Sequence, residues 1–255
     1  MKILTIARHS FKELIRKKDF AVLFILFIAL IGFFYTESFF GTSDASRYLK
    51  DIGFSLITLF SIVIALTFSA KQIPAELAER TVYPLLAKPV SRTEFVLGKY
   101  VGSVLMSVGS FTVFFALYAG VIATKGEGTS LVMLAQSYLF GALLLTLLSA
   151  VSIFFSLFLT LSANVTLTFL IYFLIRWVNT TIQEVILTSK GAVSALYSFI
   201  YYLLPHFEFY DIKIRLVHHW DPLPAWVVCS VVGYTVVYVT LILWGAVRSF
   251  KRKSL

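Results

Sequence analysis

The chain has 255 residues, of which 59% are hydrophobic and 14% charged, and its formal net charge is +9. Soluble proteins contain roughly 45–50% apolar and about 25% charged residues, so this balance indicates a membrane protein. It excludes a disordered chain, because disorder requires low hydrophobicity. The single cysteine, Cys229, excludes a disulfide-based scaffold and leaves the redox compartment undetermined.

Apolar runs long enough to cross about 30 Å of hydrocarbon predict an all-α membrane fold in a single domain, residues 1–255. Six spans are predicted, at residues 20–39, 52–70, 100–124, 131–161, 165–178 and 225–247. The first span follows a basic stretch, as in a signal peptide. No small-residue cleavage site follows Tyr35, so we expect a retained helix. An even number of spans places both termini on one side of the membrane.

The basic residues predict which side this is. Fifteen of the 22 lysines and arginines lie in residues 1–19, in residues 71–99 and in the tail after Val247. Positive residues near span ends are retained in the cytoplasm, so these three segments are predicted to be cytoplasmic, with the chain in the cell (inner) membrane. Topology then accounts for the net charge, and no single basic face remains to indicate a nucleic-acid partner.

Two segments outside the spans are predicted to be amphipathic helices. Residues 3–18 place apolar side chains at three- and four-residue spacing, with lysines and arginines on the rest of the helix surface. This pattern predicts a helix lying in the cytoplasmic interface. Residues 192–204 repeat the spacing within the external segment 179–224, and Pro205 ends them well short of a crossing. We expect an interfacial or re-entrant helix there.

The cytoplasmic segment 71–99 is rich in charged residues and in proline. No helix breaker lies between Pro74 and Pro84, so a short separate helix is predicted between them. A second helix is predicted to follow Ser91, because Ser91 and Glu94 match the S-x-x-E pattern of a capping box. The two helices would form a rigid elbow. An ordinary loop, in which the prolines only end helices, is the alternative.

The same segment contains short motifs in a fixed order: Glu79-Arg80-Thr81, Leu85-Leu86, Lys88-Pro89-Val90-Ser91-Arg92 and Gly98-Lys99. The series resembles the cytoplasmic signature of ABC-2 type transporter permeases, and most closely that of compact six-span permeases of the nitrous oxide reductase maturation type. Arg80 is a departure, since many relatives have glycine shortly before the threonine. The number of spans, the basic amphipathic N-terminus and the topology extend the resemblance over the whole chain.

The resemblance implies a permease subunit of an ATP-driven ABC transporter, an exporter that works as a homodimer, or a heterodimer, over two cytoplasmic ATPase subunits. The chain lacks a G-x-x-x-x-G-K-[ST] sequence, so ATP and Mg²⁺ would bind to the separate ATPase and this chain would hold no cofactor. The helix of residues 3–18 would be the family's connecting helix. The coupling helix would seat in the ATPase, with these candidate coupling residues: Glu76, Glu79, Arg80, Thr81, Tyr83 and Pro84.

Polar residues within the spans suggest a translocation path or a gate. Four hydroxyl side chains share one face of the fourth span: Ser149, Ser152, Ser156 and Thr160. They could line a polar path or allow close helix packing. Arg176, Gln183 and Glu184, near the outer end of the fifth span, should face protein or water because exposure to lipid is costly. A gate and simple snorkelling are both open interpretations there.

The external segment concentrates histidines and carboxylates: His206, His218, His219, Glu208, Asp211 and Asp221. Their spacing is not that of a zinc site, so no metal site is predicted. We expect a solvated loop that receives substrate or an accessory protein. Two alternatives to a transporter stay open: an integral membrane enzyme acting on lipid with an acid–base pair from this segment, and a membrane anchor for an ATPase. No nucleophile motif supports the enzyme, and no catalytic residue is predicted.

Overall fold

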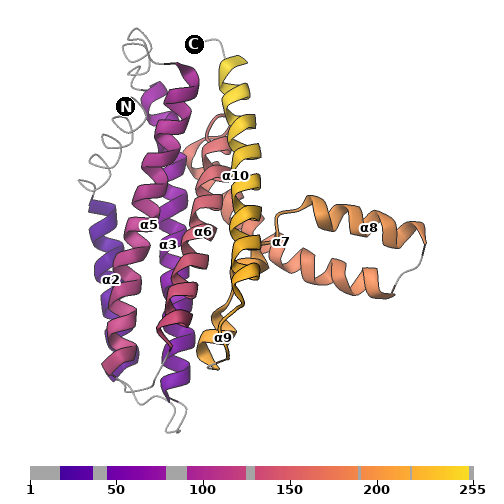
Figure 1. Ribbon diagram of the computed structural model, residues 1–255. Helices are drawn as coiled ribbons and strands as arrows, with labels where there is room; N and C mark the ends of the chain where they lie inside the picture. The colour runs from indigo at the N-terminus through magenta and orange to yellow at the C-terminus, as the bar shows by residue number, and fades with distance from the viewer. Residues whose placement is uncertain are drawn as a thin grey trace.

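The computed structural model describes residues 18–36, 45–78, 91–124, 130–188, 191–218 and 220–252. All regular structure within these ranges is helical, which confirms the predicted all-α membrane fold. The long helices stand side by side as an upright bundle (Figure 1). The predicted interfacial helix of residues 3–18 lies almost entirely outside the described residues.

Six long helices form the bundle: α2 (Lys18–Thr36), α3 (Ala45–Ala78), α5 (Arg92–Thr124), α6 (Leu131–Phe155), α7 (Leu161–Thr188) and α10 (Ala225–Arg252). Five of them, all except α2, are long and apolar enough to cross a membrane. The 19 residues of α2 extend about 28 Å at 1.5 Å per residue, which is close to the hydrocarbon thickness. Helix α3 packs against α2, α5, α6, α7 and the short helix α9 (Lys213–Val217), so it lies at the centre of the fold.

Helix α3 extends beyond the predicted span 52–70 at both ends and passes through Pro74. The prediction of a separate helix beginning after Pro74 is therefore wrong. A proline inside a helix costs about 3 kcal/mol through its missing N–H and the clash of its ring. Packing offsets this cost here, because Ile73 is fully buried and Glu76 in the last turn pairs with Lys99 of α5.

The predicted fourth span, 131–161, ends earlier in the structure than expected. Helix α6 ends at Phe155, a turn follows, and α7 begins at Leu161 and continues well past the predicted span end. The Asn164 side chain donates from Nδ2 to the carbonyl oxygen of Ser152 at 2.9 Å and so joins the two helices across the turn. The predicted break between the fourth and fifth spans, at residues 162–164, falls a few residues after this turn, because the chain is apolar on both sides of it.

The C-terminal part of α7 leaves the bundle and, with α8 (Ala192–Leu203), forms an arm that projects sideways (Figure 1). Helix α8 confirms the helix predicted over 192–204. The chain then returns to the bundle as η1 (Phe207–Tyr210) and α9 (Lys213–Val217). Phe207, Tyr210 and Leu216 are buried, so the expectation of a solvated loop is wrong for residues 206–217. Their apolar side chains fold back onto the bundle.

Candidate functional site

At one end of the bundle, α3 ends and α5 begins. The Ser91 N–H donates to Oε2 of Glu94 at 2.8 Å, and the Glu94 N–H donates to Oγ of Ser91 at 3.1 Å. These reciprocal bonds confirm the predicted capping box. They satisfy two backbone donors that have no partner inside the helix, and they fix the direction in which the chain enters α5.

An ion pair joins α3 to α5 at this end. Glu76, in the last turn of α3, contacts Nζ of Lys99 through Oε1. The Lys99 side chain is 4% exposed and that of Glu76 is 18% exposed. Charges held this far from water require a partner in a fixed geometry, because an unpaired buried charge is costly. The pair therefore keeps the two helices in one relative position.

Helix α10 is tied to the same end. Nη1 of Arg92 donates to the carbonyl oxygens of Phe250, at 3.3 Å, and Lys251, at 2.9 Å. The last carbonyls of a helix lack partners inside it, and a cation near them is favourable. The ring of Phe95 stacks on that of Phe250 with centroids 5.4 Å apart, and both side chains are buried. We call the set Glu76, Arg92, Phe95, Lys99 and Phe250 the clamp.

In the sequence, the predicted coupling segment lies between Glu76 and the clamp residues of α5. Of the candidate coupling residues, the structure describes Glu76, which pairs within the bundle. The others lie outside the described residues: Glu79, Arg80, Thr81, Tyr83 and Pro84. A force applied to residues 79–90 would reach the bundle through the two helices that the clamp holds together.

The predicted hydroxyl stripe on the fourth span is mostly buried between helices: Ser149, Ser152, Ser156 and Thr160. Oγ of Ser149 lies 3.3 Å from Oγ of Ser107 on α5, and Oγ of Ser152 donates to the carbonyl oxygen of Leu66 on α3 at 3.4 Å. Thr160 lies beyond the end of α6 and is exposed. These contacts with neighbouring helices favour close packing as the role of Ser149 and Ser152, whereas the Ser156 hydroxyl donates to the carbonyl oxygen of Ile153 in its own helix.

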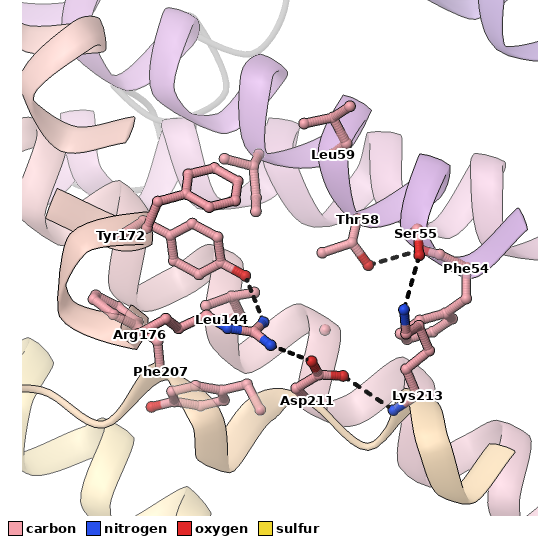
Figure 2. A pocket seen from close by; sticks show the side chains of 14 residues that line it. Phe54, Ser55, Thr58, Leu59, Leu144, Tyr172, Arg176, Phe207, Asp211 and Lys213 are labelled. Carbon is pink, nitrogen blue, oxygen red and sulfur yellow. Dashed lines mark hydrogen bonds and ion pairs between the residues drawn. The ribbon is translucent and has the colours of Figure 1, made fainter. Parts of the chain in front are cut away.

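A cavity of about 440 Å³ lies between α3, α6, α7 and the returning segment of η1 and α9 (Figure 2). Its volume is typical of small-molecule sites. Apolar and aromatic side chains form most of its wall, among them Phe54, Ile62, Leu144, Tyr172, Phe207 and Tyr210. Leu59 on α3 and Phe173 on α7 also line it and are 41% and 47% exposed, so its mouth lies between these two helices.

Four charged side chains gather at one side of the cavity: Asp51, Arg176, Asp211 and Lys213. Nη2 of Arg176 lies 2.6 Å from Oδ2 of Asp211, and Nη1 donates to the Tyr172 hydroxyl at 3.4 Å. Nζ of Lys213 lies 2.9 Å from Oδ1 of Asp51. The backbone N–H of Lys213 donates to Oδ1 of Asp211 at 3.2 Å. We call these four residues the charged rim; Figure 2 shows three of them beside the cavity.

The sequence predicted part of this site. Arg176 faces protein, as expected, because its guanidinium bonds to Tyr172 and Asp211. Gln183 instead bonds within the arm, from Nε2 to the hydroxyl of Tyr201 at 2.6 Å. Asp51 and Lys213 were missed, although a charge at the end of an apolar run was an available signal. Within the described parts of the chain, no three metal-ligating side chains come together.

Beside the cavity, His206 is buried against the arm and α10. Its Nδ1 lies 3.2 Å from Nδ2 of Asn179 and 3.8 Å from Oε2 of Glu208. The backbone N–H of His206 donates to the Tyr234 hydroxyl at 2.7 Å. Burial lowers the pKa of His206 below its ordinary value, while the Glu208 carboxylate acts in the opposite direction. Burial also raises the pKa of Tyr210, in the cavity wall, to about 12.

The helical bundle, with five long apolar helices, defines a polytopic membrane protein. The family model described as ABC-2 family transporter protein matches residues 4–255. The chain belongs to this family and is a transmembrane subunit of an ABC transporter, which confirms the resemblance seen in the sequence. None of the curated proteins compared with the chain matches it.

Proposed function

We propose that the chain is the permease subunit of an ATP-driven exporter, coupled to separate cytoplasmic ABC ATPase subunits. The family match over residues 4–255 carries this proposal. In it, ATP and Mg²⁺ bind to the ATPase, and the permease makes and breaks no covalent bond. Its termini and residues 79–90 face the cytoplasm, as the distribution of basic residues indicates.

The clamp supports a mechanical role for this end of the bundle. Residues 79–90 connect α3 to α5, and the Glu76–Lys99 pair and the Arg92 bonds to α10 hold these helices together. Helix α3 has 34 residues and extends about 50 Å as one helix. When the ATPase subunits close on nucleotide, a displacement of residues 79–90 would move α3 and α5 as one rigid body.

We also propose that two copies of the chain assemble over two ATPase subunits. Helices α7 and α10 are the least buried of the five long apolar helices, so much of their apolar surface must face lipid or another chain. Leu170, Phe173 and Leu174 of α7 are large and exposed. A two-fold axis beside α3 and α7 would cover these side chains with the same surface of a second copy.

The test replaces Glu79 and Arg80 together with alanine. If these residues contact the ATPase, the double variant binds it about tenfold or more weakly, because central interface residues commonly contribute 2 kcal/mol or more. The measurements are copurification of the ATPase in detergent and the permease-dependent change in its hydrolysis rate after reconstitution. Both should decrease, while membrane insertion of the variant stays normal.

The matched control is Glu184→Ala with Arg215→Ala. It removes one acidic and one basic residue outside the clamp: Glu184 is exposed on the projecting arm, and Arg215 lies in the short helix α9. Its coupling should equal that of the unchanged chain. Equal coupling in the Glu79/Arg80 variant would contradict the assigned contacts. A chain that binds no ATPase at all would contradict the proposed function.

A further inference from the structure

We propose that the cavity between α3 and α7 binds an anionic amphiphile, with its head group at Arg176 and Lys213 and its apolar body against the aromatic wall. The proposed binding site is inferred from the geometry of the cavity. The further statement that the bound amphiphile is the transported substrate also depends on the proposed function.

The hydrogen-bond donors of the rim favour an anion. The rim as a whole carries no net charge, because Arg176 pairs with Asp211 and Lys213 pairs with Asp51, but both cations line the cavity. Asp211 accepts from the Arg176 guanidinium through Oδ2 and from the Lys213 N–H through Oδ1. A carboxylate or phosphate of a ligand can use the same donors, and a guanidinium offers five N–H groups, more than its two contacts here use.

The ion pair at the rim is open enough to exchange. The side chains of Arg176 and Asp211 are 37% and 27% exposed, and ion pairs with this much access to water contribute little to stability. Replacing the Asp211 carboxylate with a ligand oxygen therefore exchanges one modest interaction for a similar one. Contact of the ligand body with the apolar wall then supplies the net gain in binding.

The wall argues for an amphiphile over a small water-soluble anion. A free phosphate could reach the rim, but it would leave the wall facing water, including Phe54, Tyr172 and Phe207. The mouth lies beside the exposed side chains of Leu59 and Phe173, on two helices that are long and apolar enough to span the membrane. In the proposed dimer this mouth faces the second copy, so the ligand would enter between the two permease chains with its apolar body first in contact.

The cavity is connected to the clamp through a single helix. Five lining residues lie on α3 between Phe54 and Ile62, and Glu76 of the clamp lies on the same helix. Thr58 and Glu76 are 18 positions apart, or about 27 Å along the helix. A displacement of α3 at the clamp would therefore change the shape of the cavity wall.

The experiment uses the full chain in lipid nanodiscs made of zwitterionic phosphatidylcholine. The probe is a fatty acid that carries a photoactivatable diazirine, and the labelled peptides are located by mass spectrometry. Labelling should concentrate on residues 54–62 and 172–176. Dodecyl phosphate should compete with it, whereas dodecanol and dodecyltrimethylammonium should not. Equal competition by all three, or labelling spread over the lipid-facing helices, would overturn the proposal.

Two variants test the head-group contacts. Arg176→Gln and Lys213→Gln should each weaken the competition by dodecyl phosphate about tenfold, since a hydrogen bond to a charged group is lost. Arg215→Gln, the same type of change outside the lining, should have no effect. Asp211→Asn removes the carboxylate that competes with the ligand for Arg176, so this variant should bind the ligand more tightly. If the rim had only a structural role, binding would not become tighter. Unchanged affinity in these rim variants would overturn the proposal.

A second pair of variants tests the mouth. Leu59→Trp should obstruct it and reduce labelling severalfold, whereas Leu105→Trp, a matched change at an exposed leucine of α5, should not. Adding phosphatidylglycerol to the nanodiscs distinguishes the sources of the ligand: competition indicates that a two-chain anionic lipid also fits, and its absence restricts the site to single-chain amphiphiles. Equal labelling in both tryptophan variants would place the site elsewhere.

The ATPase separates this inference from the proposed function. If labelling of the cavity is absent while the permease still changes the rate of ATP hydrolysis, the inference fails and the function stands. If the cavity binds the probe but no ATPase responds to the permease, the proposed function fails and the binding site stands.

Discussion

The clamp and the charged rim are both built from ion pairs against helix α3, but in opposite ways. At the clamp, the Glu76–Lys99 pair is almost enclosed by protein. At the rim, the pair between Asp51 of α3 and Lys213 lies beside the Arg176–Asp211 pair at the cavity, and both pairs stay partly exposed. A buried pair holds its helices in one geometry, because separating the two residues leaves an unpaired charge away from water. An exposed pair can exchange partners, because water solvates its charges. The difference suggests one fixed end and one adaptable end of the same helix.

The largest expected effect comes from breaking the pair at the clamp. Lys99→Met removes the ammonium group opposite the buried Glu76 carboxylate and should lower the free energy of unfolding by about 3–5 kcal/mol. Thermal or denaturant unfolding in detergent measures this. Arg176→Gln at the rim should cost under about 1 kcal/mol in the same assay. Similar losses at the two ends would remove the contrast between them.

The control for this change is the double variant Glu76→Met with Lys99→Met. Because it removes both charges together, most of the stability should return. If the double variant is as unstable as Lys99→Met, packing and not charge accounts for the loss. If it also keeps normal coupling to the ATPase, Glu76 serves the bundle and does not contact the partner.

A smaller effect is expected where the cavity wall meets the packed core. A Cβ at Gly141, which lines the cavity on α6, would overlap the buried ring of Phe111. Gly141→Ala should therefore cost about 1–3 kcal/mol through overpacking, as judged by unfolding in detergent. Gly109→Ala on α5 is the matched change, because a Cβ there meets nothing within 4 Å. Equal stability of the two variants would show that α5 and α6 can move apart at this point.

The smallest expected effect is a dependence on pH near the rim. The pKa of His206 is lowered in the folded chain, so the unfolded chain binds a proton more readily. The contribution of this group to stability is full above its ordinary pKa of 6.5 and is lost as the pH falls through that value toward the folded pKa. Unfolding followed from about pH 8 to about pH 5 should show this loss.

His206→Gln should reduce that dependence, whereas the same change at the exposed His218 should leave it intact. The clamp contains no histidine, so Lys99→Met should shift stability at every pH without changing the slope. A slope that persists in His206→Gln would assign the acid sensitivity to other groups.

Much of the fold followed from local sequence pattern. Runs of apolar residues predicted the helical membrane class, and the S-x-x-E pattern at Ser91 predicted the start of α5, because capping depends on residues three positions apart. The errors arose where packing overrides local preference. Pro74 lies within α3 because neighbouring side chains such as Ile73 are buried, and half of the returning segment 206–217 is buried although it carries several charged residues.

The sequence by itself determined the class of the protein, its family signature and the residues that should avoid lipid, among them Arg176. Only the tertiary structure decided which charges meet: Glu76 with Lys99 across two helices, and Arg176 with Asp211, 35 positions apart. Hydropathy and helix period depend on neighbours along the chain. Ion pairs and cavities depend on how helices approach one another, which is fixed by the packing of many side chains at once.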